Sequence, residues 1–147
     1  MEIRFAQKKD LPKIVALCKE HAEYEKEEYN PENKTKMLAN AIFGQVPVLN
    51  CLVVENDNTI IGYATFTKQF STWDANFYIY LDCLFLKKQT RGNGLGKLIM
   101  EKVKEYGKTQ GCNLVQWQTP DFNKRAIEFY NKIGGKSKSK ERFYLNI

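Results

Sequence analysis

The clearest chemical signal lies in the hexapeptide RGNGLG, residues 91–96, with Lys97 directly after it. An apolar run, residues 77–86, precedes this hexapeptide, and apolar residues at helical spacing follow it. Because glycine has no side chain, a phosphate can approach the backbone N–H groups of such a loop, and the dipole of the following helix favours negative charge. The pattern predicts a phosphate-binding loop at the N-terminus of a helix, assisted by the cations of Arg91 and Lys97.

Two other phosphate-binding loops fail on residue identity. A dinucleotide fingerprint starting at Gly92 needs a small residue where Lys97 stands, and it needs a strand at the head of a βαβ unit. A P-loop ending at Lys97 needs glycine in place of Arg91 and a hydroxyl residue in place of Leu98. The remaining pattern is R-x-x-G-x-G after an apolar strand.

Charge is divided unevenly along the chain, whose net charge is +6. Residues 1–86 hold nine basic and twelve acidic side chains, a net −3, whereas residues 87–147 hold fourteen and five, a net +9. The basic half suits a phosphate-bearing cofactor, a nucleic acid or a membrane surface, and the acidic half favours a cationic ligand. The basic run at residues 136–142 lacks interleaved aromatic side chains, which favours a solvated surface over nucleic-acid binding.

Length and composition bound the class of protein. The 147 residues fit one domain, residues 1–147, and no apolar stretch approaches the roughly 20 residues that cross a bilayer. The first residues lack the apolar core of a signal peptide, so we expect a cytoplasmic protein. The four cysteines form no CxxC pair, so we expect reduced thiols and no metal site.

Hydrophobic spacing predicts ten elements in the order β-α-α-β-β-β-α-β-α-β, a mixed α/β sandwich. Asn56, Asp57 and Asn58 are typical of a hairpin turn, so the fourth to sixth elements should form an antiparallel meander. The expected strands cover residues 2–6, 48–55, 59–70, 77–86, 113–118 and 142–147. The expected helices cover residues 11–22, 37–42, 95–110 and 126–133.

With this order of elements, the loop at residues 91–96 resembles the pyrophosphate loop of the GNAT (Gcn5-related) N-acetyltransferases. The block NKRAIEFYNKIGG, residues 123–135, is similar to the late helix of that family. Within the family the chain resembles the diamine (spermidine/spermine and thialysine) acetyltransferases. This second resemblance is carried by Tyr24-Glu25, VPVLNCLVVE at 46–55, Trp73, Tyr80-Leu81-Asp82, Asn123 and Phe129-Tyr130. One departure is Asp82-Cys83, where the subfamily commonly has Glu-Asp.

The resemblance implies the GNAT acyl-CoA N-acyltransferase fold, in which two strands splay apart to admit the pantetheine arm of acetyl-CoA. It implies acetyl-CoA as cosubstrate, no metal, a primary amine on a small cationic molecule as acceptor, and a homodimer. The cofactor-binding residues it implies are Leu84, Phe85, Leu86, Arg91, Gly92, Asn93, Gly94, Leu95, Gly96, Lys97, Asn123, Lys124, Arg125 and Ala126. The substrate-binding residues it implies are Tyr24, Glu25, Asp82, Gln116, Trp117 and Gln118.

The same resemblance implies direct transfer with two catalytic residues, Tyr130 and Asp82. Tyr130 would protonate the departing thiolate, and a backbone N–H near Leu84 would stabilise the developing oxyanion. Asp82, directly or through water, would take a proton from an ammonium whose usual pKa is near ~10.4, and Glu25 would hold a distal cation. The alternatives are another amine acceptor, such as a peptide, an amino acid or an aminoglycoside, and a non-catalytic CoA-binding module. His21 is expected on a helix face without a role.

Overall fold

The centre of the sheet is built on the hairpin that the turn residues predicted. The computed structural model describes residues 1–147, and it places β2 (Asn50–Asn56) and β3 (Thr59–Ser71) antiparallel around Asp57 and Asn58. Both turn residues have positive φ, 48° and 58°, which Asn and Asp tolerate and which matches the twist of a two-residue hairpin. β3 then turns back into β4 (Asn76–Leu86), which completes the predicted meander.

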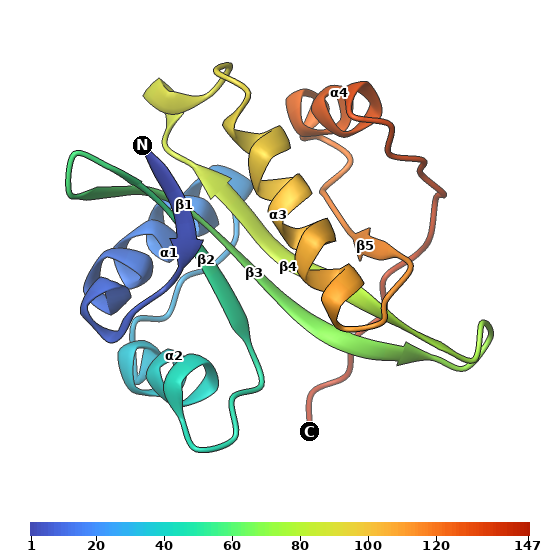
Figure 1. Cartoon of the computed structure of the whole chain (residues 1–147), viewed down its shortest axis with the longest axis horizontal. Helices are drawn as coiled ribbons and strands as arrows, with labels where there is room; N and C mark the ends of the chain where they lie inside the picture. The colour runs from blue at the N-terminus through green and yellow to red at the C-terminus, as the bar shows by residue number, and fades with distance from the viewer.

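The sheet has five strands in the order β1-β2-β3-β4-β5 (Figure 1). β1 (Glu2–Phe5) pairs antiparallel with β2 at one edge, and β5 (Val115–Trp117) pairs parallel with β4 at the other. The parallel pair requires a crossover, which α3 (Leu95–Thr109) supplies after the short 3₁₀ helix η2 (Lys88–Thr90). The mixed sheet with helices on its faces confirms the predicted fold class.

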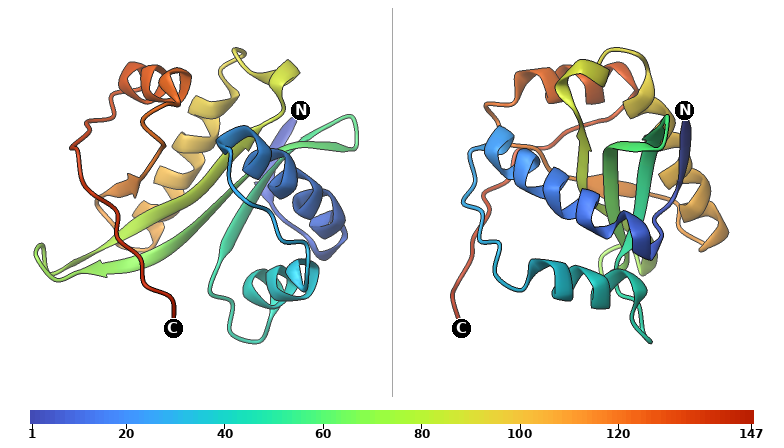
Figure 2. Two further views of the ribbon diagram at one scale, coloured as in Figure 1. Left: turned by 180° about the vertical axis from the view of Figure 1, so that it is seen from behind. Right: turned by 90° about the vertical axis from the view of Figure 1, so that its left-hand side faces the viewer.

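Helices cover both faces of the sheet because the strands bury side chains on both faces. Leu52 and Val54 of β2 belong to the core cluster under α3, while Cys51 and Val53 belong to the cluster under α1 (Leu11–Glu25). This alternation follows from the two-residue period of a strand. α1, led by η1 (Lys8–Asp10), and α2 (Lys34–Phe43) lie on the face opposite α3 (Figures 1 and 2), and all four cysteines are free.

A bulge and a parting of strands mark the middle of β4. Thr65 of β3 pairs with Cys83, but the next residue, Phe66, pairs with Leu81, so Asp82 is the extra residue of a β-bulge. β5 pairs with β4 only at Ile79–Leu81. From Asp82 to Leu86 the edge of β4 that faces β5 therefore has no strand partner, which is the separation that the resemblance implied.

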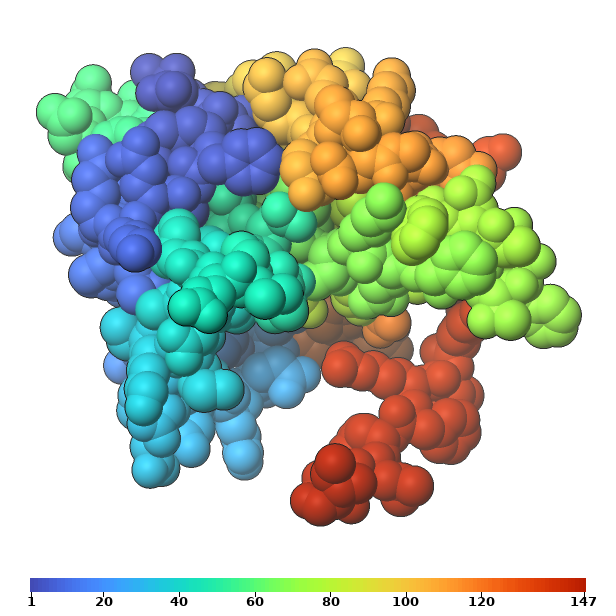
Figure 3. Space-filling model, turned by 60° about the horizontal axis from the view of Figure 1, so that its bottom comes forward, coloured from blue at the N-terminus to red at the C-terminus, as the bar shows by residue number.

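The last predicted strand, residues 142–147, is wrong. After α4 (Lys124–Lys132) the chain forms no further helix or strand, and Phe143, Tyr144, Leu145 and Ile147 are 85–125% exposed. An alternating apolar segment becomes a strand only when it forms backbone hydrogen bonds with another strand. A candidate partner is the outer edge of the three-residue β5, and no strand pairs with that edge. Figure 3 shows this C-terminal segment standing away from the body of the molecule.

None of the helices combines the length and the apolar character needed to cross a membrane.

Candidate functional site

The loop at residues 91–96 has the backbone conformation that its glycines predicted. Gly92 and Gly94 have φ of +93° and +77°, a region that side-chain-bearing residues rarely adopt, and no atom lies within 4 Å of the Cβ that either could carry. Gly94 caps α3, and the first amide of that helix to find a carbonyl is Leu98 N–H, which donates to Gly94 at 3.2 Å. The preceding amides are therefore available to an anion, at the positive end of a 15-residue helix.

The side chain of Arg91 turns inward from this loop. Its Nε donates to the carbonyl of Leu86 at 2.7 Å, and its guanidinium lies 4.3 Å from the ring centroid of Tyr24 and 5.3 Å from that of Phe85. These contacts tie the loop to β4 and to the end of α1. Arg91 thus shapes the loop, while Lys97 is exposed to solvent.

Gly96 serves a different purpose from Gly92 and Gly94. A Cβ at this position would lie 2.8 Å from the ring of Phe129, which is too close for two carbon atoms. The missing side chain lets the first turn of α3 approach α4. The phosphate-type loop and the helix that carries Tyr130 are therefore packed together.

Asn123 joins α4 to α1. Its Oδ1 accepts the backbone N–H of Ala126 at 3.2 Å, which caps α4, and it also accepts the hydroxyl of Tyr24 at 3.1 Å. Asn123 is 8% exposed, whereas Lys124 and Arg125 point to solvent. Both Tyr24 and Asn123, which the sequence assigned to ligand contacts, therefore form a bridge between the two helices.

Tyr130 is packed among aromatic side chains. Its ring lies 5.1 Å from those of Trp117 and Phe129, centroid to centroid. Burial raises the pKa of Tyr130 to about 12, and the nearby charge of Glu25 adds to the effect because it disfavours a phenolate. The hydroxyl keeps its proton at neutral pH, as general acid catalysis requires.

Asp82 lies at the bulge of β4 and is exposed to solvent. The thiol of Cys83 donates to its Oδ2 at 3.6 Å. Burial, together with the charge of Asp82, raises the pKa of Cys83 to about 12, so this thiol stays protonated and is a poor nucleophile. The carboxylate is free to meet a cation from solvent, while the neighbouring thiol is not poised for covalent catalysis.

His21 is the residue that the sequence reasoning missed. Its Nε2 lies 3.3 Å from Oε1 of Glu25, its Nδ1 lies 3.0 Å from the hydroxyl of Tyr63, and its ring stacks on Phe85 at 5.0 Å. The i, i+4 spacing of His21 and Glu25 was the one available signal, since such residues are neighbours on a helix. Tyr63 lies 42 residues away on β3, so no sequence pattern connected it to them.

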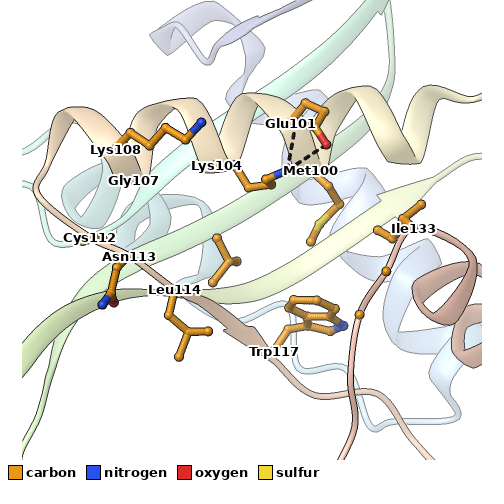
Figure 4. A pocket seen from close by; sticks show the side chains of 13 residues that line it. Met100, Glu101, Lys104, Gly107, Lys108, Cys112, Asn113, Leu114, Trp117 and Ile133 are labelled. Carbon is orange, nitrogen blue, oxygen red and sulfur yellow. Dashed lines mark hydrogen bonds and ion pairs between the residues drawn. The ribbon is translucent and has the colours of Figure 1, made fainter. Parts of the chain in front are cut away.

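The three predicted substrate-binding residues at the end of β5, Gln116, Trp117 and Gln118, differ in exposure. Trp117 is half-buried against Tyr130, whereas Gln116 and Gln118 are exposed. Trp117 also lines a groove between α3, β5 and the end of α4 (Figure 4), beside the Lys104–Glu101 ion pair of 3.0 Å. Asp82, Glu25 and Tyr130 do not line this groove, and Trp117 is the candidate site residue that it shares.

Comparison with known proteins agrees with this geometry. The model of the acetyltransferase (GNAT) family matches residues 14–135. A thialysine N-epsilon-acetyltransferase of Bos taurus is 33% identical over 140 residues, covering 90% of this chain and 82% of that protein. A solved structure of a Bacillus halodurans protein, a tetramutant, is 24% identical with a TM-score of 0.82 and covers 100% of both chains. The structure of AAC(6')-Iy with the bisubstrate analogue CoA-S-monomethyl-acetylneamine is 19% identical with a TM-score of 0.84, covering 99% and 97% of the two chains.

Proposed function

The chain belongs to the acetyltransferase (GNAT) family, and on that premise we propose that it acetylates a primary amine of a small cationic molecule of the diamine type. The coarser activity, an acetyl-CoA-dependent N-acetyltransferase, follows from the family and from the curated relatives.

The residues around the loop and β4 fit acetyl-CoA. The positive φ of Gly92 and Gly94, with the free amides at the start of α3, suits a pyrophosphate, and Lys97 adds a cation. The edge of β4 that faces β5 has no strand partner from Asp82 to Leu86, and its backbone groups, other than the Leu86 carbonyl that accepts from Arg91, are open to the pantetheine arm. Contact with this arm is the role we assign to Leu84–Leu86. Acetyl-CoA supplies the activated acetyl thioester when it is bound.

Two groups of this chain handle the protons of the reaction. Asp82, exposed beside the unpaired edge of β4, removes a proton from the substrate ammonium directly or through water. Tyr130 retains its proton at neutral pH because its pKa is about 12, and it donates that proton to the departing sulfur. We assign the stabilisation of negative charge on the carbonyl oxygen to an unpaired backbone N–H near Leu84.

The observation that carries the substrate class is the pair of carboxylates, Glu25 and Asp82. Glu25 lies 3.3 Å from His21, whose ring stacks on Phe85 of β4, three residues after Asp82. The two carboxylates therefore come from neighbouring parts of α1 and β4, and each raises the pKa of His21. Glu25 also acts on Tyr130. A substrate with two ammonium groups matches two carboxylates beside the proton donor, and the thialysine N-epsilon-acetyltransferases among the relatives act on an amine of an amino acid.

A thiol-release assay with acetyl-CoA tests the acceptor. We expect diamines, polyamines or thialysine to give a higher kcat/KM than matched monoamines, and we expect added salt to reduce the advantage. Higher activity on neutral amino acids, aminoglycosides or peptides would replace the proposed substrate class. Absence of turnover on every amine would favour a CoA-binding module.

We also propose a homodimer in which the C-terminal segment takes part. Its apolar side chains, Phe143, Tyr144, Leu145 and Ile147, are exposed, and the outer edge of β5 is open. Exposed apolar segments and unpaired strand edges are both sites of association. Light scattering should give twice the chain mass of 17.1 kDa, and deletion of residues 142–147 should lower it to the monomer. A monomeric parent chain would overturn this proposal.

A further inference from the structure

The side chains of Tyr63, His21 and Glu25 contact one another in a line that runs from the buried β3 to the candidate site. Tyr63, 2% exposed, meets Nδ1 of His21 at 3.0 Å, and Nε2 of His21 meets Glu25 at 3.3 Å. The side chain of His21 is 12% exposed and that of Glu25 is 28% exposed, so exposure rises along the line. Glu25 is therefore the member of the line that a ligand can reach.

The protons of this line have one consistent arrangement. Burial raises the pKa of Tyr63 far above its usual value, so its hydroxyl keeps its hydrogen and can donate to Nδ1. A neutral imidazole that accepts at Nδ1 carries its hydrogen at Nε2. That N–H then donates to the carboxylate of Glu25, which fixes the tautomer of His21.

The groups around the ring keep it neutral near pH 7. Burial lowers the pKa of His21 as the largest effect, Glu25 and Asp82 oppose it, and Arg91 reinforces it. Tyr63, Cys18 and Cys83 approach from the sheet and from α1 without a charge, because the pKa values of all three are raised by burial. The His21–Glu25 pair therefore carries a net charge of about −1 at neutral pH.

We propose that His21 is a positioning residue whose neutral imidazole, held by Tyr63, fixes Glu25 as the anionic contact for the second ammonium group of a diamine. This inference rests on the proposed acetylation of cationic amines. A protonated His21 would cancel the charge of Glu25 and would add a cation beside Arg91. The preference for a diamine over a monoamine should therefore decline as the pH falls through the pKa of His21.

NMR can test the arrangement without turnover, because His21 is the only histidine of the chain. In a ¹⁵N-labelled parent at pH 7.5 we expect a neutral ring with the proton on Nε2. The His21 pKa should lie below 6.5 in the parent and lower still in Glu25→Gln, since Glu25 raises it. A proton on Nδ1, or a charged ring at pH 7.5, would overturn the arrangement.

Two variants of His21 separate positioning from packing. His21→Gln keeps an N–H for Glu25 but cannot titrate, so it should retain most of the diamine preference and should lose its dependence on pH. His21→Leu keeps an apolar filling against Phe85 and loses the donor, so the KM of a diamine should rise about 5- to 10-fold, with a smaller change in kcat. Tyr63→Phe removes the donor to Nδ1 but leaves the carboxylate of Glu25 that accepts from Nε2, so the proton should stay on Nε2.

The outcomes distinguish this inference from the proposed function. If the parent acetylates diamines and His21→Leu, shown to be folded by circular dichroism, keeps the parental ratio of diamine to monoamine kcat/KM, the inference falls and the function stands. Equal defects in His21→Gln and His21→Leu at every pH would also overturn it, since a packing defect alone would explain them. If the parent acetylates no diamine, both fall together.

Discussion

The proposed cofactor side and the proposed amine side of this molecule, called the cofactor side and the amine side below, are built in different ways. The cofactor side uses backbone groups, namely the free amides of residues 92–97 and the open edge of β4. The amine side uses side chains, with Glu25 on α1, Asp82 on β4 and Tyr130 on α4. The first side consists of two chain segments joined by a short turn, and the second comes together only when three distant elements pack.

This contrast has a chemical cause. A pyrophosphate is the same in every reaction of an acetyl-CoA enzyme, so glycines and a helix N-terminus suffice to bind it. An amine must be selected, positioned and deprotonated, which requires titratable groups in defined surroundings. Substitutions on the amine side should therefore alter turnover and pH dependence, whereas those on the cofactor side should alter affinity for acetyl-CoA.

The largest effect is expected from Tyr130→Phe, which removes one oxygen atom from the amine side. The ring and its contacts with Trp117 and Phe129 remain, so acetyl-CoA affinity should be unchanged. Loss of the proton donor should lower kcat and kcat/KM together by ~10²–10⁴-fold, or by less because a thiolate leaves readily.

Tyr106→Phe is the matched control, because the ring of Tyr106 packs on Phe5 and Phe66, away from the site. It loses the same oxygen atom and should keep parental kinetics. Parental kcat in Tyr130→Phe, measured where chemistry limits the rate, would make Tyr130 a packing residue.

Gly94→Val tests the cofactor side. The bulky side chain should obstruct the approach of the pyrophosphate and weaken acetyl-CoA binding about 10-fold or more, as measured by calorimetry. Gly111→Val controls for backbone strain, because Gly111 also has positive φ, +70°, with nothing near its Cβ position, but follows the far end of α3. Equal acetyl-CoA affinity in the two variants would remove the loop from the cofactor site.

The two sides also differ in how far the sequence alone revealed them. The conformation of the glycine loop could be predicted because it depends on six consecutive residues, and Gly92 and Gly94 have the expected positive φ. The binding of a pyrophosphate there stays a prediction. The hairpin turn at Asp57 and Asn58 could be predicted for the same reason, because it depends on consecutive residues. The bulge at Asp82 could not be predicted, because it depends on the register of β3 against β4.

Distant contacts decide the features that the sequence did not reveal, including the one wrong strand. Residues 142–147 have the alternation of a strand, yet they lack a strand to pair with. His21 resembles an ordinary helix-face residue until Tyr63 and Phe85 are packed against it. Arg91 was expected at the phosphate, but its guanidinium lies over Tyr24, whose partner Asn123 is almost 100 positions further along the chain.

Asp82→Asn should show the pH response that the cofactor side lacks. Near pH 7 we expect kcat/KM for the best amine to fall by about 10-fold, because the substrate ammonium loses its proton acceptor. The defect should shrink as the pH rises toward ~10.4, since solvent then supplies the neutral amine. Asp57→Asn, in the distant hairpin turn, removes the same charge and should match the parent. A defect in Asp82→Asn that is constant with pH would argue for binding alone.

The smallest effect should be seen in stability, and it concerns the amine side only. The pKa of His21 is lower in the folded chain than its usual value of 6.5, so below pH 6.5 the unfolded chain binds more protons at this position. The contribution of His21 to the free energy of unfolding should be constant above pH 6.5. It should decrease as the pH falls below 6.5, by at most about 1.4 kcal/mol per pH unit for one proton.

Urea unfolding of the parent and of His21→Gln at pH 7.5 and 5.5 isolates this contribution, because every other titrating group is shared and cancels in the difference. The parent should lose more stability than the variant between the two pH values, while Gly94→Val should lose as much as the parent. If His21→Gln and the parent lose the same amount, His21 binds protons equally well in both states, and the amine side would contain no buried neutral imidazole to hold Glu25.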